Sequence, residues 1–250
     1  MNNACLTNIQ KTFAVQYENL VTRAVEALRQ FILDELLVPG AELPSQGELA
    51  ERLGVSRTVI REAMRILESQ GLLEITQGKL PRVLPPNTQV VIDGLSTLME
   101  RSSATLLDVL EVRRPVEIEV AVLAAERATG EHLRQMSEAN EALAKAKTIE
   151  AQILADMRFH KIVAESTGNP VFGIVLDVLA QFLFESRRTT LKQSGAKVAL
   201  RHHQQLLKAI EERDLTKARQ AAADGMCQTE ADLKREAKQS AKRKRSPRRR

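Results

Sequence analysis

The chain has 250 residues, enough for two domains of ordinary size, and 43% of them are apolar but only 3% aromatic. No apolar run approaches the roughly 20 residues of a membrane span, and the N-terminus lacks the apolar core of a signal peptide. Cys5 and Cys227 lie far apart, which excludes a disulfide framework and indicates free thiols in a reducing cytoplasm. Because Ala, Leu and Val dominate, we expect a mainly α fold.

The net charge of +5 is unevenly distributed along the chain. Residues 234–250 contain ten Lys or Arg and one Glu, a net +9, which leaves −4 for residues 1–233. We expect this basic segment to be a disordered tail that adds salt-sensitive, sequence-independent affinity for DNA. The alternative is a solubilising terminus without a dedicated role.

The chain begins with a segment of little pattern, residues 1–19, which we expect to be a flexible arm. Apolar residues at helical spacing then predict an amphipathic helix over 20–37, and Pro39-Gly40 ends it. An extended connector, residues 38–44, leads from this helix into the next pattern.

Residues 44–70 indicate two short helices joined by a tight turn. Gly54 can take the positive φ that closes the turn, and Ser56 is suited to cap the second helix. The predicted inward residues are Leu49, Ala50 and Leu53 on the first helix and Val59, Ala63, Ile66 and Leu67 on the second. Arg57, Thr58 and Arg61 face away from this stripe, where they could reach bases and phosphates in a DNA major groove. The alternative is a surface helical hairpin with solvated arginines.

A strand, a turn at Gly78 and a second strand are predicted over residues 71–83, which would form a wing beside the second helix. A helix–turn–helix followed directly by a wing is a more specific signal than either part alone. Pro81 cannot donate to a strand ladder, so we expect imperfect pairing. Lys79 or Arg82 could supply positive charge for the DNA backbone.

The run LVPGAELPSQGELAERLGVSRTVIREAMRILESQGLLE resembles the winged-helix DNA-binding domain of the GntR family of bacterial transcription regulators. The resemblance covers about 60 residues, and it implies a winged-helix domain over residues 20–84. It implies operator contacts at the helix start and minor-groove contacts at the wing tip, by Ser56, Arg57, Thr58, Arg61, Gln77 and Gly78. Gly47 stands where many members have a DNA-contacting Arg, so the operator is expected to differ from the commonest type.

Pro85-Pro86 marks the end of this domain, and residues 87–103 fit a short linking helix within a linker over 85–103. From residue 104 to 233 the pattern is entirely helical. The predicted helices cover 105–128, 130–146, 149–167, 170–191, 197–213 and 215–237. The predicted architecture is therefore an N-terminal winged helix-turn-helix domain and a C-terminal all-α bundle that binds an effector and dimerises.

Arg113 and Glu117 share an apolar helical stripe with Leu106, Leu110 and Val120. Burying either charge unpaired would be costly. They could pair with each other one turn apart, or they could face a polar cavity inside the bundle. The planar fork of an Arg suits a carboxylate ligand, so both residues are candidate effector-binding residues.

Asp156 and His160 lie four residues apart on one predicted helix face, and His203 lies on an inward stripe while His202 falls to its side. One carboxylate and two imidazoles could hold a divalent metal such as Zn, Ni or Mn. The alternative is a pair of core histidines whose polar atoms are satisfied by Asp156 and the backbone.

Three segments resemble the all-helical FCD effector domain of FadR-type GntR regulators, namely LLDVLEVRRPVEIEVAVLAAERAT, ADMRFHKIVAESTGNPVF and HQQLLKAIEERDLTKAR. In metal-binding members of that subgroup, an Asp and a His four residues apart and two further His hold the ion. Asp156, His160 and His203 match the first three, but Gly225 stands where the fourth ligand is expected. The resemblance thus leaves two possibilities, a three-ligand metal site or a cavity that holds an acid directly.

We therefore expect a cytoplasmic, nucleoid-associated homodimer that binds a palindromic double-stranded operator and responds to a small carboxylate, such as an organic acid or a sugar acid. Most relatives in the family repress, so we expect a repressor and not an enzyme. One alternative is a metal-dependent hydrolase fused to a DNA anchor, although the H-E-x-x-H spacing is absent. Another is a non-specific nucleoid-type DNA binder that depends on the basic tail.

Overall fold

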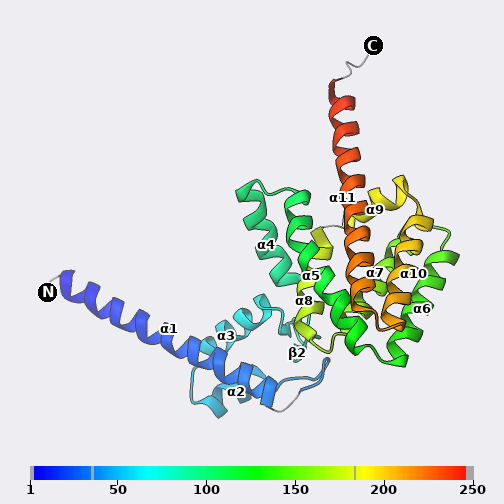
Figure 1. Cartoon of the computed structure of the whole chain (residues 1–250). Coiled ribbons are helices and arrows are strands. Elements are labelled where there is room, and N and C mark those ends of the chain that lie inside the picture. Colours follow the sequence, from blue (N-terminus) through cyan, green and yellow to red (C-terminus); the bar gives the residue numbers. More distant parts are fainter. Residues whose placement is uncertain (1–2, 35–36, 183, 246–250) are drawn as a thin grey trace. The chain divides into compact units, whose positions relative to one another are not determined.

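The computed structural model describes residues 3–34, 37–182 and 184–245, and the chain divides into two compact units, Met1–Val90 and Val91–Arg250. Figure 1 shows that helices dominate both units. Among the described residues, the strands form one short antiparallel pair. The mainly α fold with a winged N-terminal unit and an all-helical C-terminal unit is confirmed.

The first unit contains three helices and two strands: α1 (Asn3–Asp34), α2 (Gln46–Leu53), α3 (Arg57–Ser69), β1 (Leu73–Glu74) and β2 (Arg82–Val83). Its core joins α1, α3 and the wing through Leu28, Ile60, Met64, Leu67 and Leu73, each at most 2% exposed. Burial of each such side chain contributes about 1.5–3 kcal/mol to stability. This core therefore fixes the position of α3, whose opposite face is exposed.

The turn between α2 and α3 forms for the reasons that the sequence suggests. Ser45 and Glu48 make a reciprocal capping box at the start of α2. Gly54 has a φ of 64°, a left-handed conformation that a residue with a β-carbon adopts at a cost. The Ser56 hydroxyl then accepts the Val59 amide and caps α3.

The wing pairs over only two residues per strand, with Leu73 opposite Val83 and Glu74 opposite Arg82. This confirms the imperfect pairing expected from Pro81. That residue still accepts through its carbonyl, because the Leu43 amide donates to it at 2.8 Å. The connector after α1 thereby lies along the outer edge of β2.

Two details of the first unit differ from expectation. Helix α1 begins at Asn3 and not near residue 20, because the segment expected to be an arm contains no Pro or Gly to stop a helix. Leu53 and Ile66 are 38% and 36% exposed, so they were wrongly assigned to the inward stripe. The buried face of α3 is centred instead on Ile60, Ala63, Met64 and Leu67.

The second unit is a helical bundle. Its helices are α4 (Gln89–Ser102), α5 (Leu106–Arg127), α6 (Gly130–Lys145), α7 (Ile149–Glu165), α8 (Pro170–Phe182), α9 (Phe184–Gln193), α10 (Ala196–Glu211) and α11 (Leu215–Arg245). Helix α5 packs against α7, α8, α10 and α11, and α7 packs against α6, α8 and α9. Phe159 and Ile210 are fully buried in the core that these helices share.

The bundle follows the predicted helices except at two places. The single helix expected over 170–191 is two helices, α8 and α9, and residue 183 between them lies outside the described residues. The basic tail was expected to be disordered from residue 234, but α11 continues to Arg245 because Lys, Arg, Ala and Glu favour a helix. Residues 246–250 lie outside the described part. Within that part, no helix is both long and apolar enough to cross a membrane.

Candidate functional site

The N-terminal end of α3 presents the side chains expected to contact DNA. Ser56, Arg57, Thr58 and Arg61 are all exposed, as predicted. Neither Arg57 nor Arg61 makes a hydrogen bond or an ion pair with any described residue, whereas Arg65 on the same helix lies 3.4 Å from the Glu62 carboxylate. The first two turns of α3 therefore offer two guanidinium groups with all their donors available.

A groove runs between the start of α2, Arg57 and the wing. A β-carbon built on Gly47 would lie 3.3 Å from the Nη2 atom of Arg57, so the guanidinium rests directly over this glycine. The absence of a side chain at position 47 thus leaves room for Arg57 to reach into the groove. Gly47 was expected only to remove one DNA contact. It also determines where the Arg57 side chain lies.

The wing tip is the second part of this surface. Gln77 and Gly78 are exposed in a turn that the Lys79 amide closes by donating to the Thr76 carbonyl at 3.1 Å. Gly78 has a φ of 77° there. Arg82 was considered as a source of backbone charge, but its guanidinium binds Glu42 at 2.8 Å. Of the two candidates, Lys79 is the one whose side chain makes no hydrogen bond or ion pair with a described residue.

A charged cavity lies inside the second unit, and α5, α7, α9, α10 and α11 all contribute to its lining. It brings together every residue predicted for the effector and metal sites: Arg113, Glu117, Asp156, His160 and His203. Arg113 and Glu117 pair with each other and also line the cavity, so both possibilities left open by the sequence hold together.

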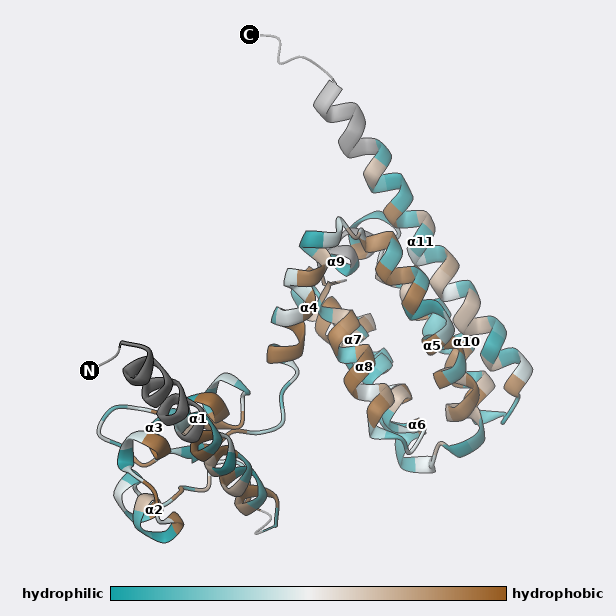
Figure 2. Ribbon diagram, turned by 90° about the vertical axis from the view of Figure 1, so that its left-hand side faces the viewer, coloured by the Kyte–Doolittle hydropathy of each residue, from teal (hydrophilic) through white to brown (hydrophobic). Residues whose placement is uncertain are grey.

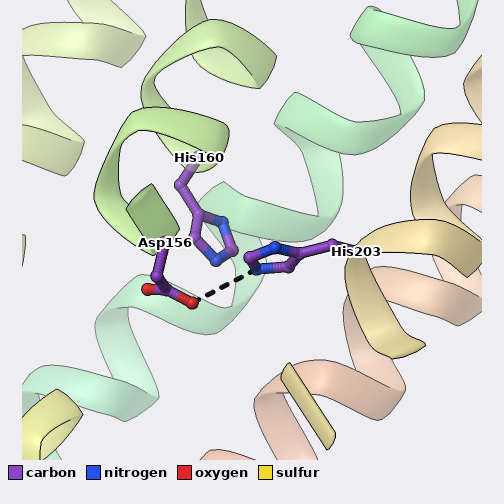
Figure 3. A group of neighbouring side chains, drawn as sticks. All are labelled: Asp156, His160 and His203. Atoms are coloured by element: carbon purple, nitrogen blue, oxygen red, sulfur yellow. Dashed lines mark ion pairs between the residues drawn. The ribbon is translucent and has the colours of Figure 1, made fainter. Parts of the chain in front are cut away.

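Asp156, His160 and His203 lie close together, and an ion pair joins Asp156 to His203 (Figure 3). One oxygen of Asp156 lies 3.2 Å from Nε2 of His203, and the other lies 2.8 Å from Nε of Arg187. Nδ1 of His203 lies 3.1 Å from Oδ1 of Asn140, in a hydrogen bond whose direction depends on the tautomer. The ring of Phe159 stacks on His203 with centroids 4.0 Å apart, which fixes the imidazole plane.

The two buried carboxylates are held in their charged forms. Burial opposes this, but the neighbouring Arg113, His160 and Arg187 keep the pKa of Glu117 well below its ordinary value. Burial likewise opposes ionisation of Asp156, and Arg187 and His203 hold the pKa of that carboxyl far below its usual range. Burial lowers the pKa of His203 against the pull of Asp156. The cavity therefore contains the charged carboxylates of Glu117 and Asp156, two guanidinium groups and an imidazole that burial favours as neutral. The side chain of Asp232, which is fully buried, also lines it.

Ligand atoms of Asp156, His160 and His203 lie within 4.8 Å of one another, which is the spacing of a candidate metal site. Gly225 lines the same cavity, where the resemblance places a fourth ligand, and it supplies no donor atom. Arg187 already neutralises the Asp156 carboxylate at 2.8 Å, and a divalent cation on that carboxylate would be repelled by the guanidinium. In this arrangement the cluster does not fit a resident metal ion.

Sequence reasoning missed two charged residues of the cavity lining, Arg187 and Asp232, and it also missed Asn140, which contacts His203. Arg187 lies in the polar run ESRRTT, whose weak periodicity gives no inward face. Asn140 lies on α6, outside every motif. His202 was expected to fall to the side, but it lines the cavity, and neither ring nitrogen has a partner among the described residues. Its place beside the small Gly225 explains the difference, because a β-carbon built there would lie 4.0 Å from that of His202.

Comparisons with known proteins agree with both units. The model of the "Bacterial regulatory proteins, gntR family" matches residues 20–83, and that of the "FCD domain" matches residues 108–226. The galactonate operon transcriptional repressor of Escherichia coli (strain K12) is 35% identical over 213 residues, covering 82% of this chain and 92% of that protein. The HTH-type transcriptional repressor NanR of Klebsiella aerogenes is 30% identical over 203 residues, covering 78% of each chain.

A solved structure, Streptococcus agalactiae GntR, matches with a TM-score of 0.72 at 26% identity, covering 84% of this chain and 99% of that one. These relatives are regulators, so the hydrolase alternative has no support from them. The resemblances seen in the helix–turn–helix segment and in the helical segments are both confirmed. The chain belongs to the gntR family of bacterial regulatory proteins, carries an FCD domain, and is a DNA-binding transcription regulator and not an enzyme.

Proposed function

We propose that this protein is a homodimeric repressor that binds a palindromic operator and releases it when a sugar acid occupies the cavity of the second unit. The observation that carries the proposal is the charged cavity, in which Arg113 and Arg187 are both buried. Each guanidinium is paired with an internal carboxylate but keeps one buried nitrogen without a partner among the described residues, and an acid is the ligand that such a fork suits.

The operator would be read by α3 and the wing. Arg57 and Arg61, whose guanidinium groups have no partner among the described residues, could contact guanine or phosphate, and Ser56 and Thr58 have hydroxyls for phosphate. The exposed wing tip would enter the adjacent minor groove through Gln77 and Gly78. Because the body of the chain is mildly acidic, the placement of these few side chains must supply most of the recognition.

Dimerisation would use α5 and α8, which pack side by side. Val112, Val171 and Ile174 are 60%, 58% and 51% exposed, and Figure 2 shows α8 as a largely hydrophobic helix. Exposed apolar side chains gathered on neighbouring helices are typical of an interface. A twofold dimer through this face would place two reading helices for two half-sites of a palindrome.

The acid class follows from the cavity and from the relatives. The E. coli relative is the repressor of a galactonate operon, and galactonate is a sugar acid. Arg113 would bind the carboxylate, and Glu117 would hold Arg113 in position. The acid would act only through a difference in its affinity for the operator-bound and the released conformation.

The test begins with selection of DNA by the full-length protein from a random library, which supplies the operator. Operator binding is then followed by fluorescence anisotropy while galactonate, other aldonates, dicarboxylates and neutral galactose are added. We expect a palindromic operator and saturable release by an acid but not by galactose. A protein that selects no sequence would contradict the regulator, and one that no acid releases would contradict the effector class.

A further inference from the structure

Two guanidinium groups in the cavity have donors that nothing in the described structure satisfies. Nε of Arg113 and Nη1 of Arg187 are buried without a hydrogen-bond partner, although both residues are paired through other nitrogens. An unsatisfied buried donor on a charged group is costly, so each such group calls for an explanation. Both residues line the same cavity, and an acceptor placed there would satisfy them.

Each of these guanidinium groups already has a carboxylate partner. Arg113 is paired with Glu117, and Arg187 is paired with Asp156. Asp232, the third buried carboxylate of the lining, accepts from Ser194 and Gln228 and faces Arg235 at 3.6 Å. A divalent cation on Asp156 would place two positive charges beside the Arg187 guanidinium, whereas a carboxylate would place a single negative charge near two guanidinium groups.

We propose that Arg187 takes the place of a divalent metal at Asp156, and that the effector's carboxylate binds directly to Arg113 and Arg187. This inference rests on the proposed function and assigns Arg187 a ligand-binding role. Both guanidinium groups line one cavity, so an anion between them would lie beside two positive charges.

The other end of the ligand is identified by His202. Both of its ring nitrogens are buried and have no hydrogen-bond partner among the described residues. A neutral imidazole has one donor and one acceptor, which suits a hydroxyl group. The ligand is therefore a hydroxylated acid, with its carboxylate at the two arginines and hydroxyls toward His202.

The test measures acid binding and metal binding on the same full-length protein. Galactonate is titrated by calorimetry in the presence and absence of EDTA, and zinc, nickel and manganese are titrated separately after the protein's metal content is measured. We expect galactonate to bind equally with and without EDTA. Arg187→Met should weaken galactonate about 10- to 150-fold, the value of a hydrogen bond to a charged group. The same variant should bind the metals more tightly, because Asp156 loses its internal cation.

The neighbouring Arg188 provides a matched control. It is part-exposed, lies outside the cavity lining and faces Glu150 at 3.5 Å, so Arg188→Met removes the same charge without touching the site. We expect it to leave galactonate affinity and metal affinity unchanged. Arg187→Lys keeps the charge but not the fork, and it should weaken galactonate while still excluding metal. If Arg187→Met does not fold by circular dichroism, Arg187→Lys and the EDTA comparison still decide.

The outcomes separate this inference from the function on which it rests. Galactonate binding that EDTA abolishes and a metal restores would overturn the role of Arg187 while supporting a sugar-acid effector. If no acid binds under any condition, the proposed effector class is wrong, and the metal titration alone decides about Asp156. One equivalent of tightly bound metal in the wild-type protein would then overturn the inference.

Discussion

Arg57→Ala is the substitution that best tests how the operator is read. Arg57 is exposed at the first turn of α3 and makes no hydrogen bond or ion pair with a described residue. A surface substitution of this kind changes stability by only about 0.5 kcal/mol or less. Any loss of affinity can therefore be attributed to the contact with DNA.

The expected loss follows from the geometry of a guanine contact. A bidentate Arg–guanine pair is worth about 1–3 kcal/mol of discrimination, a factor of about 5 to 160. In a dimer on a palindrome both half-sites lose the contact, so the total approaches twice this free energy. The loss should be large on the selected operator and small on a scrambled duplex.

The assay is fluorescence anisotropy on the selected operator and on a scrambled duplex of equal length, over a series of salt concentrations. Arg65→Ala is the matched control, because it removes the same charge from the same helix but from a side chain that pairs with Glu62 at 3.4 Å. We expect it to retain discrimination. An equal loss on both duplexes with Arg57→Ala would refute base reading, and no loss on either would refute the assignment of α3 as the reading helix.

Four other outcomes are expected. Gly47→Ala should move the Arg57 guanidinium, which lies 3.3 Å from the built β-carbon, and we expect selection from random DNA to return an altered operator preference; an unchanged preference would disprove this control of specificity. Glu117→Ala should lower the free energy of unfolding, measured in urea, by about 3–5 kcal/mol, because it leaves Arg113 buried and unpaired. The control Glu119→Ala, at an exposed ion pair, should cost at most about 1 kcal/mol. Equal effects of the two substitutions would refute the buried pair. The pKa of Glu117 is lowered in the folded state, so the stabilisation that its charged form contributes is complete above the ordinary value of 4.5 and is lost as pH falls below it. Urea unfolding measured at falling pH should therefore show a flatter pH dependence in Glu117→Gln than in the wild type. Removal of residues 239–250 should reduce the salt dependence of binding equally on operator and scrambled DNA, and complete loss of operator preference would favour the non-specific binder.

The local rules of the chain predicted the first unit well. Gly54 and Ser56 specify the turn and the cap of α3 through contacts within a few residues, so spacing alone is sufficient to place them. The capping box of Ser45 and Glu48 was not predicted. The exposure of residues at the edge of an apolar stripe is harder to predict. Ile66 is adjacent in sequence to the fully buried Leu67, and only packing against α1 decides which of the two is buried. The ends of α1 and α11 were misjudged because sequence without an apolar stripe can still be helical.

The cavity was predicted only in part, for a physical reason. Arg113 with Glu117 and Asp156 with His160 lie one turn apart, so their shared face is visible in the sequence. Arg187 reaches Asp156 across 31 positions of chain and from a different helix, and no local pattern reports such a contact. Arg187, which the sequence did not reveal, changes the chemistry that we infer for the site. Its guanidinium lies on the carboxylate of Asp156, so a set of candidate metal ligands becomes a site for an acid.

The most direct measurement of the central claim is the calorimetric affinity of galactonate for the free protein and for the protein saturated with operator. If the cavity controls DNA binding, galactonate should bind the operator complex more weakly, by the same factor by which it weakens operator binding. Equal affinity of galactonate for the free and the operator-bound protein would contradict the account, because a ligand that does not distinguish the two states cannot shift the balance between them.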